Sequence, residues 1–130
     1  MIKNPLRSLL AGLFLIGSLT AAAGVGSATD IHFALSKSEP EADASVEAPA
    51  EVRLWFTEEP QDGTVSVRVL DASEEQAMTM DVTQSEDDAR SFAVAFHHPP
   101  AAGTYTVAWR GIGSDGHVVR DTFTFTVTAQ

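Results

Sequence analysis

The stretch that decides the fold is Gly103–Val127, GTYTVAWRGIGSDGHVVRDTFTFTV. Its two limbs carry large apolar side chains at every second position: Tyr105, Val107 and Trp109 in the first, and Phe123, Phe125 and Val127 in the second. A period of two indicates strands with one buried face. The residues between the limbs, Gly113-Ser114-Asp115-Gly116, are typical of a turn. The sequence therefore predicts a well-packed β-hairpin whose loop holds a carboxylate, Asp115, and an imidazole, His117.

Five further segments before the hairpin have strand character, at residues 31–35, 51–57, 65–69, 77–82 and 92–96. Turn residues separate them, and no segment has the period of an amphipathic helix. Residues 38–49 are rich in Glu, Ala, Pro and Ser, which predicts an extended connection. The pattern predicts an all-β fold, a seven-stranded Greek-key β-sandwich or barrel of the immunoglobulin-like kind. The approach Pro-Ala-Ala-Gly-Thr-Tyr is similar to a tyrosine corner, in which the hydroxyl of Tyr105 bonds nearby backbone.

The first 28 residues have the features of a secretory signal. Lys3 and Arg7 give a positive start, and the apolar run that follows is too short to span a bilayer as a mature helix. Small residues favour cleavage after residue 28, with cleavage after Ala23 as the alternative. We expect a single exported domain at 29–130 without stable membrane insertion; a retained N-terminal anchor is the competing interpretation.

Composition narrows the classes of partner. The chain has 8 basic and 18 acidic residues, a net charge of −10, and no cysteine. Removing the signal takes away two of the basic residues. Such an acidic domain is not expected to bind nucleic acid or anionic membrane surfaces. Without thiolates, a metal site must use imidazole, carboxylate, thioether, backbone or amine groups.

The histidines and carboxylates suggest a metal site more than an enzyme. The chain has no nucleophile elbow, no phosphate-binding loop and no His-Glu-x-x-His spacing. Asp115 and His117 are at positions i and i+2, so in an extended backbone their side chains point to the same side. They can converge on one ion such as Cu(II), Zn(II) or Ni(II). Two ligands bind weakly, so a further donor must come from elsewhere. The alternative, which spacing alone favours, is that Asp115 caps the turn and His117 is merely exposed.

Three other sets of side chains are candidates. His32 would approach His117 if the first strand lay beside the hairpin; otherwise it is a lone histidine on a strand edge. Met78 and Met80 form a soft pair at i, i+2 that suits Cu(I), but gap-filling core methionines are the favoured interpretation. The histidines at 97–98 are adjacent, so on a strand they would point to opposite faces.

Taken together, these residues resemble the CopC family of periplasmic copper-binding proteins. The resemblance covers nearly all of the predicted mature chain and rests on five fragments in order. They are HFALSKSEP from His32, APAEVRLWFTE from Ala48, AGTYTVAWR from Ala102, SDGH from Ser114 and FTFTV from Phe123. The resemblance implies a seven-stranded Greek-key sandwich that binds Cu(II) in the periplasm.

The family's Cu(II) site contains an N-terminal histidine, an Asp-x-His pair and, in some members, a nearby glutamate. By position these are His32, Asp115, His117 and Glu58. The family's Cu(I) site lies in a methionine-rich loop; only Met78 and Met80 remain in that region, so no Cu(I) site is expected. One departure is that Thr29-Asp30-Ile31 precede His32, so the α-amino group is not that of the histidine unless processing removes them.

The main functional hypothesis is a non-enzymatic Cu(II) carrier or buffer in copper homeostasis or resistance. The resemblance implies an inner-membrane importer of the CopD type as its partner. One alternative is an oxidase or monooxygenase with a histidine brace, which would need the terminal amine. The other is an immunoglobulin-like interaction module with a vestigial metal site.

Overall fold

The computed structural model describes residues 32–129, and these form strands, turns and loops without a helix. The predicted signal and both cleavage positions lie outside the described residues. The strands are β1 (Leu35–Glu39), β2 (Ser45–Val46), β3 (Glu51–Phe56), β4 (Ser66–Leu70), β5 (Thr83–Gln84), β6 (Ser91–Ala95), β7 (Gly103–Ile112) and β8 (Val118–Val127). This part of the chain contains no helix that could cross a membrane.

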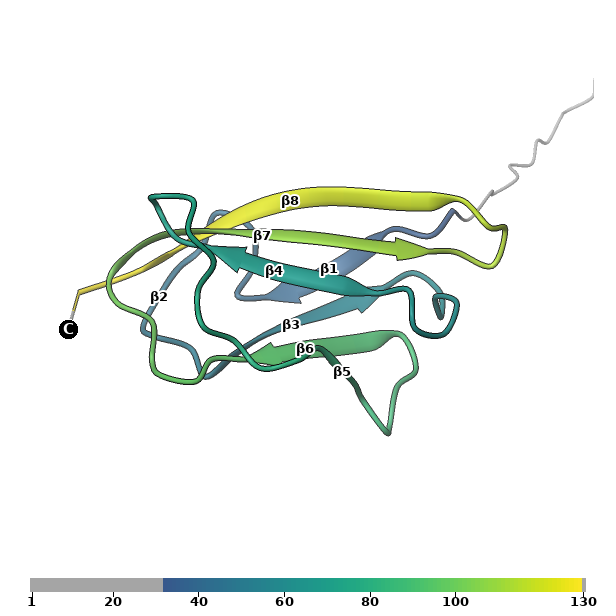
Figure 1. Cartoon of the computed structure of the whole chain (residues 1–130), viewed down its shortest axis with the longest axis horizontal. Helices are drawn as coiled ribbons and strands as arrows, with labels where there is room; N and C mark the ends of the chain where they lie inside the picture. Colours follow the sequence, from purple (N-terminus) through teal and green to yellow (C-terminus); the bar gives the residue numbers. More distant parts are fainter. Residues whose placement is uncertain (1–31, 130) are drawn as a thin grey trace, which may run out of the picture. The chain divides into compact units, whose positions relative to one another are not determined.

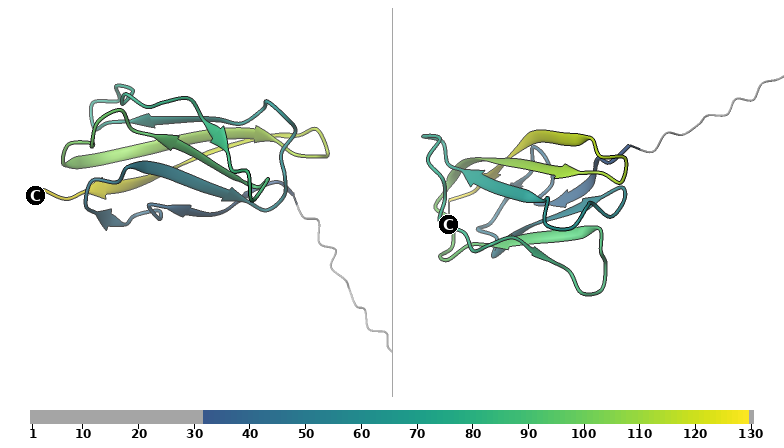
Figure 2. Two further views of the ribbon diagram at one scale, coloured as in Figure 1. Left: turned by 90° about the horizontal axis from the view of Figure 1, so that it is seen from below. Right: turned by 45° about the vertical axis from the view of Figure 1, so that its right-hand side comes forward.

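The strands form two sheets that pack face to face (Figures 1 and 2). One has the order β1-β3-β6-β5 and the other the order β2-β8-β7-β4. All pairs are antiparallel except β2 with β8. The prediction of an all-β sandwich is confirmed, although the structure has eight strands where the sequence pattern predicts seven.

The β7–β8 hairpin is the longest pairing. It runs without a register shift from the pair of Gly103 with Val127 to the pair of Ile112 with Val118. The side chains predicted to face inward contribute much of the core. The buried apolar residues of the sandwich are Phe33, Val52, Leu54, Phe56, Val69, Phe92, Ala93, Val94, Phe96, Tyr105, Val107, Trp109, Phe125 and Val127. The Tyr105 hydroxyl donates a hydrogen bond of 2.7 Å to the carbonyl of Ala101, which confirms the predicted tyrosine corner.

The first strand begins later than predicted, at Leu35 rather than residue 31. A register shift follows Leu35 in its pairing with β3. Before Leu35, the amide and hydroxyl of Thr57 make the hydrogen bonds that a neighbouring strand would otherwise make. The Ala34 amide donates to the Thr57 hydroxyl at 3.0 Å, the Thr57 amide donates to the Ala34 carbonyl at 2.8 Å, and the Thr57 hydroxyl donates to the His32 carbonyl at 3.0 Å. The His32 backbone is thus fixed without being part of a strand.

Two other expectations for local structure need correction. Residues 38–49 are not merely a connection, because they contain the end of β1 and all of β2. The weak strand predicted at 77–82 does not form. The chain there makes isolated bridges, Leu70 with Gln76 and Thr79 with Phe96, and β5 begins only at Thr83.

Phe33 links the N-terminal segment to the β7–β8 hairpin. Its ring is 2% exposed and lies 4.7 Å from the Phe56 ring and 6.2 Å from that of Trp109, between centroids. A Cβ added to Gly111 or Gly113 would lie only 2.8 or 2.7 Å from Phe33. The two glycines therefore leave the room that Phe33 fills, and this packing holds the neighbouring His32 beside the hairpin loop.

Candidate metal centre

The loop between β7 and β8 is closed by its own backbone and by Asp115. The Gly113 amide donates to the His117 carbonyl at 3.2 Å, and the Gly116 amide donates to the Gly113 carbonyl at 2.9 Å. Gly116 has φ of 84°, a conformation that glycine adopts at little cost. Oδ1 of Asp115 accepts the backbone N–H of His117 at 3.0 Å. The turn-capping role that spacing favours is therefore present.

Two imidazoles also lie close to the carboxylate of Asp115. Nδ1 of His117 lies 3.0 Å from Oδ2 of Asp115, and Nδ1 of His32 lies 3.8 Å from that same oxygen. The structure thus brings the beginning of the described chain to the Ser-Asp-Gly-His loop, as the dark blue segment before β1 shows in Figure 1. We call these three side chains the His–Asp cluster.

The cluster is open to solvent. The side chains of His32 and His117 are 70% and 79% exposed, and that of Asp115 is 42% exposed. Residues 32–129 contain no group of three or more His, Asp or Glu already spaced to enclose a metal ion. In this arrangement both imidazoles approach the carboxylate, so metal binding would require their side chains to turn. Exposed side chains can do so without disturbing the core.

Asp115 is well suited to remain charged. The backbone N–H of His117 is the main cause that lowers the pKa of Asp115, and the hydrogen bond with the His117 side chain is the next. A carboxylate with a lowered pKa stays ionised at neutral and mildly acidic pH. The cluster therefore offers a fixed negative charge beside two nitrogen donors, a set that suits a borderline or harder divalent cation.

Glu58, in the bend that follows β3, supports the loop between β7 and β8. Its Oε1 accepts hydrogen bonds from the backbone N–H of Ser114 at 2.9 Å and from the Ser114 hydroxyl at 3.0 Å. Gln61 adds a bond from its side-chain amide to the Gly113 carbonyl at 3.0 Å. The family resemblance implies Glu58 as a ligand, whereas its hydrogen bonds to Ser114 could not be predicted, because nothing in the local sequence pairs the two residues.

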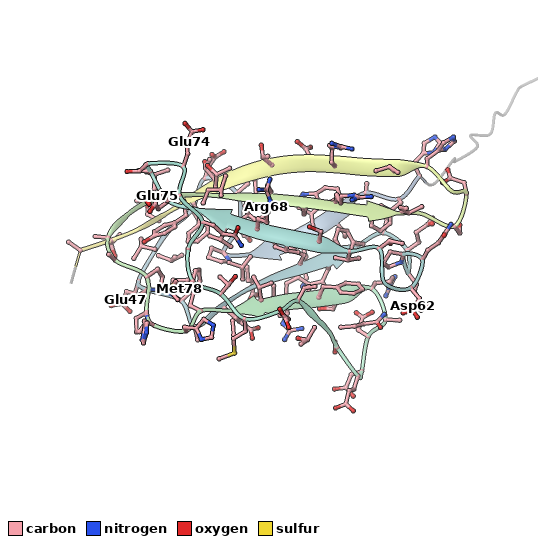
Figure 3. All side chains as sticks on the ribbon, in the orientation of Figure 1. Glu47, Asp62, Arg68, Glu74, Glu75 and Met78 are labelled. Carbon is pink, nitrogen blue, oxygen red and sulfur yellow. The ribbon has the colours of Figure 1, made fainter. Side chains whose placement is uncertain are left out.

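The interpretation of Met78 and Met80 as core methionines is wrong. Their exposed fractions are 68% and 50%, and Figure 3 labels Met78 in the segment that follows β4. The segment runs along the edge of a sheet, where the Met78 carbonyl accepts the His97 amide at 3.0 Å. Met78 and His98 line one hollow of about 220 Å³. The absence of a Cu(I) site here stays a prediction, which rests on there being only two methionines in this region.

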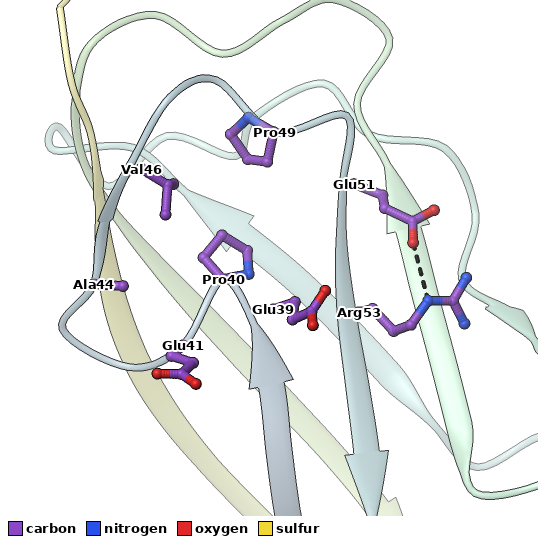
Figure 4. Close-up of a pocket in the computed structure, with 8 residues that line it drawn as sticks. All are labelled: Glu39, Pro40, Glu41, Ala44, Val46, Pro49, Glu51 and Arg53. Atoms are coloured by element: carbon purple, nitrogen blue, oxygen red, sulfur yellow. Dashed lines mark hydrogen bonds and ion pairs between the residues drawn. The ribbon is translucent and has the colours of Figure 1, made fainter.

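The remaining histidines and another hollow lie away from the cluster. His97 and His98 are exposed in the bend that follows β6, next to the beginning of β3. A hollow of about 430 Å³ lies near that end too, and Glu51 and Arg53 of β3 help to line it (Figure 4). The His–Asp cluster is beside the loop that follows the end of β3, so neither feature contributes to it.

The fold and the cluster define a class: a β-sandwich domain with histidine and carboxylate side chains exposed at the tip of its main hairpin. The CopC domain model matches residues 35–128, which is most of the chain. The chain belongs to the CopC family. The match includes Glu58, Asp115 and His117, whereas His32 lies just before it.

Relatives and solved structures agree with this membership. The chain is 29% identical over 127 residues to copper resistance protein C of Escherichia coli, covering 92% of this chain and 98% of that one. It is 30% identical over 97 residues to protein YobA of Escherichia coli (strain K12), covering 74% and 78%.

Two crystal structures resemble the fold. CopC from Methylosinus trichosporium OB3b has a TM-score of 0.69 and 28% identity, covering 76% of this chain and 96% of that one. PcoC, a methionine-rich copper resistance protein from Escherichia coli, has a TM-score of 0.67 and 30% identity, covering 75% and 99%.

Proposed function

We propose that this protein is a periplasmic Cu(II)-binding protein that carries or buffers copper, with His32, Asp115 and His117 as ligands. The observation that carries the proposal is the convergence of two imidazoles, far apart in sequence, on the single carboxylate of Asp115. Membership of the CopC family and similarity to copper resistance proteins support a copper-related function. An inner-membrane importer of the CopD type is the partner that the family resemblance implies.

The His–Asp cluster combines a fixed backbone with exposed side chains, and this combination suits a carrier. The long hairpin fixes Asp115 and His117 on one side, and the hydrogen bonds to Thr57 together with Phe33 fix the His32 backbone on the other. Only the exposed side chains need to turn toward the ion. Because the ligands lie on the surface, a partner can approach the bound copper and exchange ligands with it. The proposal therefore assigns no catalytic role.

Copper affinity should fall as the medium becomes acidic. Imidazole binds metal in its neutral form, and histidine has an ordinary pKa of about 6.5. Protons therefore compete with the metal for each imidazole, and in mildly acidic medium each imidazole that must lose a proton should weaken binding by up to about tenfold per pH unit. The lowered pKa of Asp115 keeps its carboxylate charged in this range. Titration with Cu(II) against a competing chelator between about pH 7.5 and 5.5 measures the effect. A constant affinity would argue against imidazole ligands.

Replacing Glu58 by glutamine separates a supporting role from a ligand role. Glutamine keeps an acceptor oxygen for Ser114 but removes the charge. We expect Cu(II) affinity to fall by about tenfold, which is typical of groups that orient metal ligands. The matched control is Glu59→Gln, which removes the same charge from an exposed neighbour and should change affinity little. A loss from Glu58→Gln as large as that from Asp115→Asn would make Glu58 a ligand.

A further inference from the structure

Three arginines gather on the outer face of the sheet formed by β2, β8, β7 and β4. In the strand register Arg110 lies opposite Arg120 on one side and Ser66 on the other, and Arg68 lies opposite Ala108 in the next row. All three arginine side chains are exposed, and Figure 3 labels Arg68 on β4. We call Arg68, Arg110 and Arg120 the arginine face.

The arginine face is unusual in so acidic a chain because its charges have no ion-pair partner among residues 32–129. The other basic side chains in residues 32–129 have partners: Lys37 lies 4.4 Å from the centre of the Trp55 ring, Arg53 pairs with Glu51 at 3.0 Å, and Arg90 pairs with Asp88 at 3.5 Å. Within the same residues no carboxylate is within ion-pair distance of the arginine face. Like charges placed directly opposite each other on two strands destabilise a sheet. The pair of Arg110 with Arg120 therefore lowers the stability of the fold.

A hollow of about 270 Å³ lies among these arginines. The short side chains of Ala108 and Thr122 form part of its lining and leave space between the guanidinium groups. Asp121 is also at the hollow, but its Oδ1 accepts the Thr122 amide at 2.8 Å. A guanidinium group presents paired N–H donors that match a carboxylate. The hollow can therefore receive an acidic side chain between arginines.

We propose that the arginine face is the docking surface for an acidic segment of a partner protein. Charge complementarity favours a protein over a membrane. The chain carries a net charge of −10, so an extended anionic bilayer would meet repulsion from most of its surface. A short acidic segment meets only the arginine face, where opposite charge gives both orientation and a faster encounter.

The arginine face lies near the His–Asp cluster, so a partner that docks there would be close to the proposed copper site. Arg120 is three residues from His117 along the hairpin, which corresponds to about 10 Å at ~3.3 Å per residue. A partner held at the arginine face would have its own metal ligands beside the His–Asp cluster. This last step rests on the proposed function, since it assumes that copper is bound there. The docking itself does not.

The test uses a peptide of six glutamates and the protein purified from the cell with the N-terminus that its processing leaves. Binding is followed by NMR at about 0.15 M salt, where screening already limits non-specific attraction, with a chelator present to keep the protein metal-free. We expect the largest shifts in β4, β7 and β8. We also expect R110Q/R120Q to weaken peptide binding by about tenfold or more. The control K37Q/R90Q removes the same charge elsewhere and should change binding by less than about twofold.

Three outcomes would overturn the docking proposal: no peptide binding, equal weakening by both double variants, or tighter binding to vesicles rich in phosphatidylglycerol than to the peptide. A Cu(II) titration of R110Q/R120Q keeps the two proposals apart, because its copper affinity should equal that of the unmodified protein. Failure of the unmodified protein to bind copper would remove the proposed function while leaving the peptide result to decide the docking surface.

Discussion

Replacing His117 by alanine should abolish tight Cu(II) binding while leaving the thermal unfolding of the metal-free protein nearly unchanged. The imidazole is 79% exposed and contributes nothing to the core. Alanine keeps the backbone N–H that Asp115 accepts, so the turn stays closed and the main cause of the lowered pKa of Asp115 remains. The variant therefore removes one nitrogen donor and little else. We expect a loss larger than the ~10–100-fold that outer-shell partners typically cost.

The matched control for this variant is His98→Ala, which removes another exposed imidazole from the bend after β6. Both variants and the unmodified protein are titrated with Cu(II) against a competing chelator and melted without metal. Only His117→Ala should lose affinity, and all three should melt at nearly the same temperature. Unaltered affinity in His117→Ala would exclude His117 from the site.

Replacing Phe33 by alanine should lower the free energy of unfolding by about 3–5 kcal/mol. Phe33 is 2% exposed and packs against Phe56 and Trp109, beside Gly111 at the end of β7 and Gly113 in the loop. Such a loss is a large part of the ~5–15 kcal/mol that holds a typical domain together. Copper affinity should also fall, because Phe33 places the adjacent His32 beside Asp115. Denaturant titration measures the first effect, and Cu(II) titration of the folded variant measures the second.

Phe125→Ala is the control that separates stability from placement. Phe125 is 1% exposed and stacks on Tyr105 at the other end of the hairpin, with ring centroids 5.6 Å apart. We expect it to destabilise the protein to a similar degree without changing copper affinity. If the alanine variants do not fold, Phe33→Leu and Phe125→Leu make the same comparison with smaller cavities. Equal copper affinities in the two variants would show that Phe33 does not position His32.

The parts of the fold that local patterns determine could be predicted from the sequence. The β7–β8 hairpin has strict alternation in both limbs and a turn between them, and the structure pairs it through its whole length. The tyrosine corner likewise depends on a short local sequence. These features follow from a period of two and from turn chemistry, which are properties of neighbouring residues.

The errors arise where contacts distant in sequence decide the structure. Thr57 supplies the hydrogen bonds that fix residues 32–34, so the strand predicted at residues 31–35 begins only at Leu35. Met78 and Met80 are apolar and alternate, yet they lie on an edge segment held by bridges and not by a full ladder. Glu58 supports the loop through Ser114. None of these pairings leaves a signal in the local sequence.

The most direct test of the central claim is the paramagnetic effect of one equivalent of Cu(II) on the amide NMR signals of the protein. If a single ion is bound between His32 and the hairpin loop, signals from residues 33–34, 57–58 and 113–118 should disappear together while those near residues 78 and 98 persist. Loss of signals at only one of these segments, or first around Met78 and His98, would contradict the account.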